Sequence, residues 1–575
     1  MSKTPNYDAK IKMILNAAIL GERTCRLTGE KWNFDEEHLG WCQKFSIPPS
    51  FISPKTRVKL LFGFSTGIAI WKRPHSFTNK HILSCVHPDS PYKVIADKEW
   101  YEFEPSIPEN KLNLNQPFLP QMEELAYSVP VCALLDTGTN ENTIGVDLVN
   151  AKDCYMGFGG VNMKDLCYFS IGTGCEQSVD ITNNFYTRQS FYINHCERLF
   201  NCQVVFESQD CLNSSFLFDC RNCEYCFGAT NKRNRKYLWW NEQLSKEEWE
   251  KRRADIDLRS YKIFENWLNY FHSFIEQKAI WPENFNVKSE DSTGDYLCNC
   301  LRCYYGFWQK DSRDCFWSPF NEKNEQCYFV IWSGQTSDSY SSMAFNSHDL
   351  RCCYYCLNCK NLEYSLLCKD CEYCFGCTGL RKKSFYIYNT PYTEVDYWQK
   401  VDELKCAMLD RKEYGEFFPA RMALMGFPFS GGESFYHFSD KELEAFGAVF
   451  FDTRKGSIIE PEANILNIED IPDYLQDINE DEFIGKAIYD SESQRLYSVT
   501  PEEFCFYKEH NLPFPRKHFL TRLKKLMSYC NSAFADEQTI CQSCNLPLNV
   551  HPNQTFKNRQ ILCYPCYIKY LEVNG

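Results

Sequence analysis

The chain has 575 residues, of which 33 are cysteines and 16% are aromatic, and its formal net charge is −14. A chain of this length can bury several cores, and its aromatic content excludes wholesale disorder. The negative charge excludes a protein that binds nucleic acid over its whole surface, so only a local basic patch could contact phosphate.

Residues 1–105 predict a compact module that opens with a helix over residues 7–20. The opening residues lack the apolar core and cleavage site of a signal peptide, and no run approaches the roughly 18 apolar residues of a membrane span. We therefore expect a reducing, cytoplasmic location, in which most thiols stay unpaired and act as small hydrophobic side chains.

Residues 106–241 and 286–389 each contain a run with a small or apolar residue at every third position. A period of three fits neither an α-helix nor a simple strand. It indicates short straight segments that each send one small side chain inward, as in a parallel β-solenoid. Cysteine spacings of 9 and 21 residues suggest a repeat of 18–21 residues. The first run includes Cys196, Leu199, Cys202, Val205, Ser208 and Cys211, and the second includes Cys353, Cys356, Cys359, Leu362, Ser365 and Cys368.

A helical cap is expected after each array, over residues 242–285 and 390–425. The first begins with a capping box, in which Ser245 precedes Glu248 by three residues. The ends of the two arrays superpose at an offset of 148 residues, which places Cys220, Cys223 and Cys226 on Cys368, Cys371 and Cys374. We therefore expect a duplicated unit whose helix covers the open strand edge of its array.

An acidic connector over residues 426–486 leads to a C-terminal module over residues 487–575. That module carries Cys541-Gln-Ser-Cys544 and Cys563-Tyr-Pro-Cys566, with 18 residues between the two pairs. This spacing is typical of a zinc ribbon, in which two turns bring four thiolates to one ion. Four protein ligands leave no open position for water, so we expect one structural Zn²⁺ held by Cys541, Cys544, Cys563 and Cys566.

The C-terminal module repeats the N-terminal one at offsets of 465 and 467, yet the ligands are not repeated. Pro74, Phe77, Ala96 and Glu99 occupy the four ligand positions at the second offset. Cys25-Arg-Leu-Thr28, Ser53-Pro-Lys-Thr56 and His518-Phe-Leu-Thr521 have the spacing of zinc knuckles but lack the thiols. We expect one zinc ion rather than four, with a second metal at His75, His81 and His87 left as an alternative.

Four cysteines of the second array, Cys368, Cys371, Cys374 and Cys377, lie three residues apart. Bacterial ferredoxins use a closely related spacing for iron–sulfur clusters. Because the period of three continues through leucine, serine and valine, we interpret these thiols as inward packing residues. A bound metal or cluster and disulfide pairing remain the alternatives.

Basic residues gather at two places that could contact RNA or a ribosome. Lys232-Arg-Asn-Arg-Lys236 precedes three aromatic residues, but we favour its interpretation as a charged turn followed by a strand whose aromatic residues pack on the capping helix. A second group lies beside the predicted zinc module and comprises Arg516, Lys517, Arg522, Lys524 and Lys525.

The order of parts resembles a group of uncharacterised, cysteine-rich zinc-ribbon proteins of ultra-small candidate-phylum bacteria. The motifs that carry this resemblance are Asp89-Ser-Pro-Tyr-Lys-Val94, Asp291-Ser-Thr-Gly-Asp-Tyr296, Cys371-Glu-Tyr-Cys-Phe-Gly-Cys377 and Asn511-Leu-Pro-Phe-Pro515. The resemblance implies architecture, and it implies no activity.

The sequence thus predicts a mainly β protein with helical caps, in which two parallel β-solenoid arrays are flanked by zinc-ribbon-like modules. It carries no phosphate-binding loop, nucleophile elbow or metalloprotease motif, so we expect a zinc-binding scaffold for protein partners that is not an enzyme. A ribosome- or RNA-associated factor is one alternative, and a thiol redox or metal-storage protein that uses the array cysteines is the other.

Overall fold

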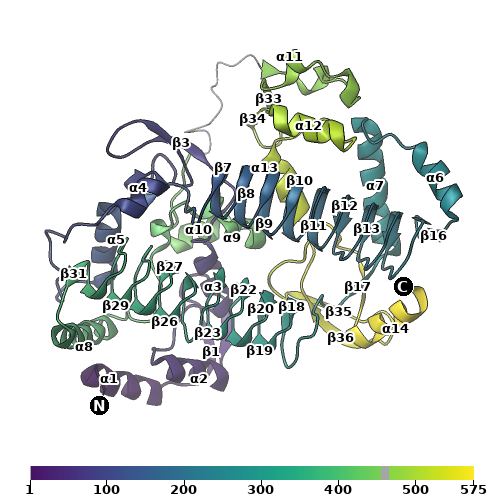
Figure 1. The fold of residues 1–575 in the computed structure, drawn as a ribbon. Coiled ribbons are helices and arrows are strands. Elements are labelled where there is room, and N and C mark those ends of the chain that lie inside the picture. Colours follow the sequence, from purple (N-terminus) through teal and green to yellow (C-terminus); the bar gives the residue numbers. More distant parts are fainter. Residues whose placement is uncertain (1, 453–454, 456–464) are drawn as a thin grey trace. The chain divides into compact units, whose positions relative to one another are not determined.

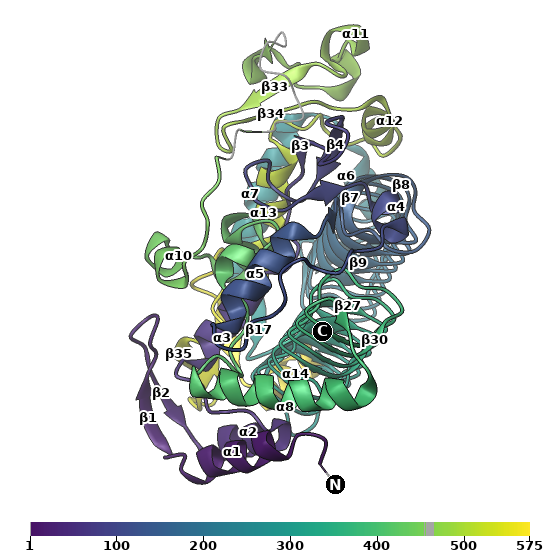
Figure 2. The ribbon, with the colours of Figure 1, turned by 90° about the vertical axis from the view of Figure 1, so that its left-hand side faces the viewer.

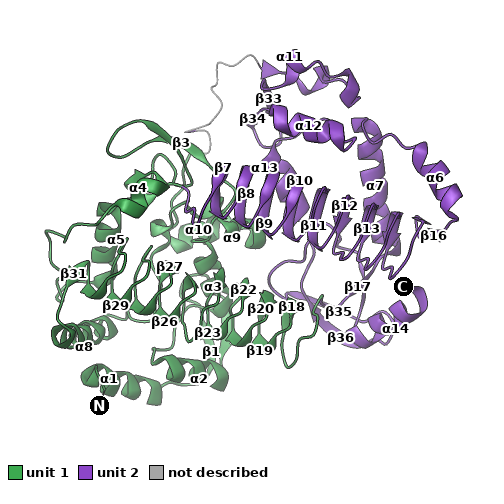
Figure 3. Ribbon diagram, viewed as in Figure 1, with its two compact units in different colours: residues 1–133, 285–453 green, residues 134–284, 454–575 purple. Residues whose placement is uncertain are grey.

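The computed structural model describes residues 2–452, 455 and 465–575 (Figure 1). The chain divides into two compact units, unit 1 with residues 1–133 and 285–453 and unit 2 with residues 134–284 and 454–575 (Figure 3). The N-terminal module therefore shares a unit with the second array, and the C-terminal module shares a unit with the first. Part of the expected acidic connector, residues 453–454 and 456–464, lies outside the described residues.

Unit 2 contains a ten-stranded sheet in which neighbouring strands are consecutive in the sequence. The pairs are parallel except the last, β15–β16, which is antiparallel. Residues twelve apart lie side by side, for example Val179 with Phe191 and Val205 with Leu217. The strands are β7 (Glu141–Val149), β8 (Lys152–Val161), β9 (Lys164–Thr173), β10 (Glu176–Phe185), β11 (Phe191–Glu197), β12 (Gln203–Phe206), β13 (Ser215–Phe218), β14 (Phe227–Thr230), β15 (Leu238–Trp239) and β16 (Glu242–Gln243).

The repeat of 18–21 residues expected from the cysteine spacings is wrong, because the register between neighbouring strands is twelve residues. Twelve residues contain four positions of the period-three pattern, and a cysteine can occupy any of them. The cysteine spacings therefore report multiples of three and not the length of one turn.

The period of three has a backbone cause. Almost every third residue of the array has a positive φ, as at Asn201 (50°), Val204 (55°) and Glu207 (53°). Such a residue redirects the chain, so that each following residue returns to the same, inward side. Asparagine and aspartate are frequent at these positions because their short polar side chains tolerate the left-handed region.

The residues that follow the left-handed positions form one continuous buried core. Thiols and hydroxyls in this core contact the same kind of acceptor, the carbonyl oxygen two residues earlier in the chain. Cys202 Sγ lies 3.4 Å from the carbonyl oxygen of Phe200, and Ser214 Oγ lies 2.7 Å from that of Leu212. None of the 33 cysteines is in a disulfide. Cysteine is thus used here as a small apolar residue with a weak donor.

Unit 1 contains the second array, whose parallel strands also pair at twelve residues, as at Cys303 with Cys315 and Leu362 with Cys374. Its turns overlap one behind another in Figure 2. The strands are β18 (Gly294–Cys298), β19 (Leu301–Tyr304), β20 (Gly306–Lys310), β21 (Arg313–Phe316), β22 (Asn321–Glu322), β23 (Glu325–Tyr328), β24 (Ser333–Gly334), β25 (Met343–Phe345), β26 (His348–Arg351), β27 (Tyr354–Leu357), β28 (Lys360–Glu363), β29 (Glu372–Phe375), β30 (Ser384–Ile387) and β31 (Thr390–Pro391).

A helix packs against the last strands of each array. In unit 2, α6 (Lys246–Ala254) brings Trp249 to Leu238, whose carbonyl oxygen accepts a hydrogen bond from Trp249 Nε1 at 3.2 Å. In unit 1, α8 (Glu394–Asp410) brings Tyr397 to Phe385, with ring centroids 5.6 Å apart. The helix expected after the first array is broken, because α7 (Tyr261–Lys278) follows α6 as a separate segment.

The rest of unit 1 is mostly the N-terminal module, whose first helix begins at Pro5 and ends at Asn16 rather than spanning residues 7–20. The elements are α1 (Pro5–Asn16), β1 (Gly21–Thr24), β2 (Lys31–Phe34), α2 (Glu36–Phe45), α3 (Pro54–Phe62), β3 (Trp71–Pro74), β4 (His81–Ser84), β5 (Val94–Ile95), α4 (Asp97–Glu102), α5 (Phe118–Ser128), β6 (Val131–Cys132), η1 (Ala420–Met422), η2 (Phe427–Phe429), α9 (Gly431–Tyr436) and α10 (Asp440–Phe446).

The rest of unit 2 is β17 (Ile280–Pro282), β32 (Ile465–Leu466), η3 (Ile468–Asp470), η4 (Leu475–Asp477), α11 (Glu480–Phe483), β33 (Ala487–Asp490), β34 (Arg495–Tyr497), α12 (Pro501–Glu509), α13 (Phe519–Met527), β35 (Glu537–Ile540), β36 (Pro547–Val550), β37 (Gln560–Leu562) and α14 (Tyr564–Asn574). Over the described residues the protein therefore combines many parallel strands with fourteen α-helices. No helix in this part of the chain is long and apolar enough to cross a membrane.

Candidate metal centre

The first pair of predicted ligands lies in the turn between the antiparallel strands β35 and β36. Cys541 N–H donates to Leu546 O at 2.8 Å, and Asn545 N–H donates to Cys541 O at 2.8 Å. Asn545 has a φ of 61°, a left-handed conformation that asparagine tolerates. This tight turn directs Cys541 and Cys544 to the same side.

The second pair lies at the start of α14. Cys563 is the N-cap residue, and Pro565 stands in the first turn, where its missing N–H costs no helical hydrogen bond. Cys566 follows three residues after the cap, so one helical turn brings the two sulfurs to the same end of the helix.

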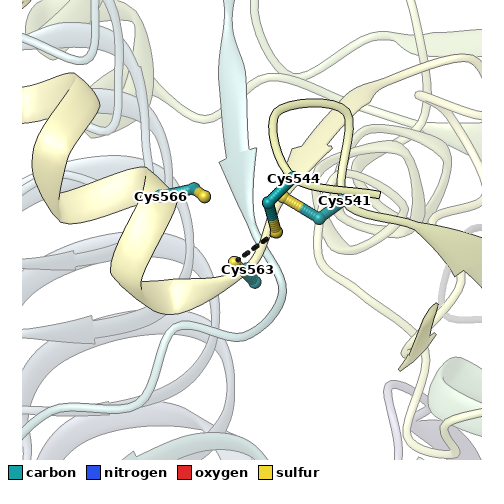
Figure 4. A group of neighbouring side chains, drawn as sticks. All are labelled: Cys541, Cys544, Cys563 and Cys566. Carbon is teal, nitrogen blue, oxygen red and sulfur yellow. Dashed lines mark hydrogen bonds between the residues drawn. The ribbon is translucent and has the colours of Figure 1, made fainter. Parts of the chain in front are cut away.

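The four sulfur atoms all lie within 4.8 Å of one another (Figure 4). The sulfurs of Cys544 and Cys563 are 3.7 Å apart. A tetrahedron with metal–sulfur bonds of about 2.3 Å has edges of about 3.8 Å, so the set has the dimensions of a four-thiolate site. Among the described residues, this is the one group of three or more Cys, His, Asp or Glu side chains that meets this distance limit.

The polypeptide favours a thiolate at one of these positions. Burial of Cys541 opposes ionisation, but backbone N–H groups at Cys563, Cys544 and Ser543 outweigh it and lower the pKa of Cys541 to about 6. A thiolate is the form of cysteine that binds metal. The group can therefore hold one metal ion, with four protein ligands and no vacant position for substrate.

The metal centre is joined to the first array within unit 2. Strand β37, which leads into Cys563, pairs in parallel with β17, and Glu283 Oε1 accepts a hydrogen bond from Tyr564 N–H at 2.8 Å. One turn into α14, the hydroxyl of Tyr567 donates to Asp219, a carboxylate of the array that is 1% exposed. Arg233 Nη2 also contacts Asp219 Oδ1, at 3.1 Å. No local pattern predicts the contacts of Tyr564 and Tyr567, because their partners lie 281 and 348 residues away.

We expect Tyr567→Phe to destabilise the segment that carries the four ligand cysteines, residues 537–574, which we call the C-terminal ribbon. The change leaves the buried Asp219 with one hydrogen-bond donor fewer. A hydrogen bond to a charged group contributes about 1.5–3 kcal/mol. Thermal unfolding followed by circular dichroism would measure the loss, with metal content unchanged. Tyr564→Phe, at a position that is 49% exposed, is the matched control and should have no comparable effect.

The second basic group is partly used inside unit 2. Arg516 donates to the carbonyl oxygens of Ile471 and Pro472, and Lys517 pairs with Glu492 at 2.8 Å. Arg522 is paired with Asp180 at 2.8 Å, where both side chains are almost fully buried. Lys524 and Lys525 are exposed. Whether this group contacts RNA or a ribosome stays a prediction.

The first basic group also has partners within unit 2. Arg233 contacts Asp219, Lys236 pairs with Glu224, and Arg235 Nη2 donates to Gly575 O at 2.7 Å. The following Trp240 stacks on Trp267 of α7, with ring centroids 5.5 Å apart. These contacts are those of a charged turn before a strand whose aromatic residues pack on a helix.

Among the described residues, no set of array cysteines brings its sulfur atoms together as closely as a metal ion requires. Cys368, Cys374 and Cys377 are fully buried, and Cys371 is 2% exposed. In the first array, burial raises the pKa of Cys175 and of Cys202 to about 12. A raised pKa disfavours the thiolate, which is the nucleophilic form, at these two positions. A redox or storage role for the array cysteines stays an untested prediction.

The sequence comparison of the two modules misplaced one turn of the N-terminal module by a residue. The turn between β3 and β4 begins at His75, so His75 and Thr78, not Pro74 and Phe77, correspond to Cys541 and Cys544. Ala96 and Glu99 hold their expected places, as the N-cap and third residue of α4. The alternative of a second metal site at His75, His81 and His87 is not supported. In the described part of the chain, these three side chains do not come together as a group that could hold a metal ion.

Within unit 2, His518 is a buried histidine whose surroundings oppose its protonation. His518 caps α13, and its Nδ1 accepts a hydrogen bond from Leu520 N–H at 3.0 Å. Burial, with Arg495 and Arg522 nearby, lowers the pKa of His518 to about 3, against the opposing effect of Asp490. The unfolded chain binds this proton near pH 6.5 and the folded chain does not, so stability present above pH 6.5 is lost as the pH falls.

We expect the free energy of unfolding to fall by about 1.4 kcal/mol from this group between pH 7.5 and 5.5. His518→Asn keeps a capping acceptor without the titration, so this part of the pH dependence should disappear. Urea denaturation at both pH values would measure it, with zinc retention checked at each. An equal pH dependence in the variant would contradict the assignment.

No family model matches the chain, and no curated protein matches it. A matching solved structure is a crystal structure from Desulfovibrio desulfuricans G20, described only provisionally as an acetyltransferase. It is 10% identical, with a TM-score of 0.11, over 45% of this chain and 68% of that one. This finding corrects the prediction that the protein is not an enzyme, and we withdraw that exclusion. A likeness this low carries no argument for acetyl transfer either.

Proposed function

We propose that the protein is a zinc-binding scaffold of the reducing cytoplasm that docks a protein partner through its C-terminal ribbon. The observation that carries the proposal is a group of exposed apolar side chains next to the metal ligands. Ile540 and Leu546 are each 52% exposed, Tyr564 is 49% exposed and Ile568 is 36% exposed. Each lies within two residues of a ligand cysteine, so a bound ion would hold all four in place.

Zinc is the metal that this donor set favours, because four thiolates in a tetrahedron suit Zn²⁺. A closed site of this kind stabilises a small domain rather than activating water. Exposed apolar side chains beside a rigid support are typical of protein contact surfaces.

We infer in addition that each array is a parallel β-solenoid that supports the modules. The twelve-residue register, the left-handed residue at every third position and the continuous buried core support this assignment. The suggested kinship with the cysteine-rich candidate-phylum proteins also stays a proposal.

The docking role is tested by affinity capture from the native cell with the full-length protein and with Leu546→Ser/Tyr564→Ser. We expect specific partners to be lost from the variant while its zinc content stays at one ion per chain. Phe77→Ser is the matched control, because Phe77 is 57% exposed on the N-terminal module. Equal capture by the ribbon variant, or equal loss in the control, would refute docking through the ribbon.

A further inference from the structure

We infer that the chain contains four sites built on the plan of the metal ribbon, and that hydrogen bonds between side chains replace the metal in three of them. This inference is independent of the docking role. The plan has two halves. A hairpin turn supplies its first and fourth residues, and a helix supplies its N-cap residue and the third residue of its first turn, as Cys541, Cys544, Cys563 and Cys566 do.

The backbone repeats the hairpin half in the N-terminal module. Cys25 N–H donates to Glu30 O at 2.7 Å and His75 N–H donates to Lys80 O at 2.8 Å, as Cys541 N–H does to Leu546 O. In each turn the fifth residue is left-handed and its N–H donates to the carbonyl oxygen of the first. These fifth residues are Gly29, Asn79 and Asn545, with φ of 75°, 58° and 61°.

A second backbone hydrogen bond, common to the three turns, joins each turn to the segment before its helix. Gln542 N–H donates to Ile561 O at 3.1 Å in the C-terminal ribbon. Its equivalents are Arg26 N–H to Phe51 O at 3.0 Å and Ser76 N–H to Val94 O at 2.9 Å. In all three cases the acceptor lies two residues before the helix N-cap, so the halves meet in one geometry.

Thiols and hydroxyls fill the first site. Cys25 and Thr28 come from the turn, and Ser53 and Thr56 are the N-cap and third residue of α3. Thr56 Oγ1 lies 3.7 Å from Cys25 Sγ, 3.4 Å from Thr28 Oγ1 and 2.9 Å from Ser53 Oγ. One hydroxyl thus contacts the other three side chains, as a metal ion would.

The second and third sites are each joined by a different polar contact. At the second site His75 Nε2 lies 2.8 Å from Glu99 Oε2, which links the turn to the helix α4. At the third, the turn residue Asp490 accepts hydrogen bonds from Thr521 Oγ1 at 2.7 Å and from His518 N–H at 3.1 Å, both at the start of α13. Ser493 Oγ donates to the same carboxylate at 2.9 Å, and Gln494 is the left-handed fifth residue, with φ 54°.

Thr28→Cys/Ser53→Cys/Thr56→Cys tests the equivalence, because it supplies the three thiols missing beside Cys25. We expect the full-length variant to bind two zinc ions per chain where the native protein binds one. After replacement by Co²⁺, the thiolate-to-cobalt absorbance per chain should double. A folded variant that keeps one ion would overturn the inference.

A second variant guards against failure of the first to fold. Thr78→Cys/Ala96→Cys/Glu99→Cys places three thiols beside His75, a ligand set that zinc accepts. It lies in a different hairpin and has the same expected result.

The native protein supplies a third, independent measurement. Chelation should raise amide hydrogen exchange over residues 537–574 and leave residues 21–56, 71–99 and 487–521 unchanged. If chelation raised amide hydrogen exchange in any of the last three segments, a metal ion and not side-chain hydrogen bonds would stabilise that segment.

Discussion

Cys544→Ser is expected to release the metal ion and to remove the folded structure of residues 537–574. Cys544 itself is exposed, so its side chain contributes little packing and the effect must come through the lost ligand. The binding free energy of a structural four-ligand zinc site is on the order of 10 kcal/mol, and it is available to folding because the unfolded chain has no preformed site. The two arrays hold no part of this ligand set and should stay folded.

Zinc content by elemental analysis and hydrogen exchange of the ribbon would measure both consequences. Cys505→Ser is the matched control, because Cys505 is also an exposed cysteine of unit 2 but lies on α12. The control should keep one zinc ion and native exchange rates. A Cys544→Ser protein with full zinc content and a protected ribbon would show that the ligand set has been misassigned.

How far the sequence could predict this protein depends on how local each signal is. The four ligands stand in two short motifs whose spacing describes a turn and a helix start, so Cys541 and Cys563 could be paired without knowledge of the fold. The period of three in the arrays is also local, because it follows from a left-handed residue at every third position. The number of residues per repeat could not be predicted from the sequence, since it depends on which strands pair.

Contacts between distant segments were likewise invisible in the sequence. Arg522 stands in a basic segment of the sequence, but it is paired with Asp180, which lies 342 residues earlier. The association of each module with the array farther from it in the sequence has the same origin. A pattern within one segment cannot reveal which remote carboxylate or strand it will meet.

Cys371→Lys is the second change from which a large effect is expected, in this case on the array of unit 1. Cys371 is 2% exposed within the core of that array. Its sulfur lies 3.3 Å from Lys369 O and 3.4 Å from Leu380 O. Lysine brings a longer side chain and an ammonium group into a space lined by thiols and leucines. The pKa of a fully buried lysine without an acidic partner can fall by about 3–5 units, which corresponds to about 4–7 kcal/mol of unfolding free energy.

Two matched variants separate the charge from its position. Cys371→Ala removes the sulfur without adding volume, and we expect a loss of about 1–2 kcal/mol. Glu372→Lys places the same ammonium one residue along, at a half-buried position outside the core, and should leave the array folded. Circular dichroism, solubility and hydrogen exchange of residues 348–387 would rank the three proteins. If Cys371→Lys were as soluble and as protected as Glu372→Lys, the side chain at 371 would have to face solvent, and the packing of every cysteine in phase with it would have to be reassigned.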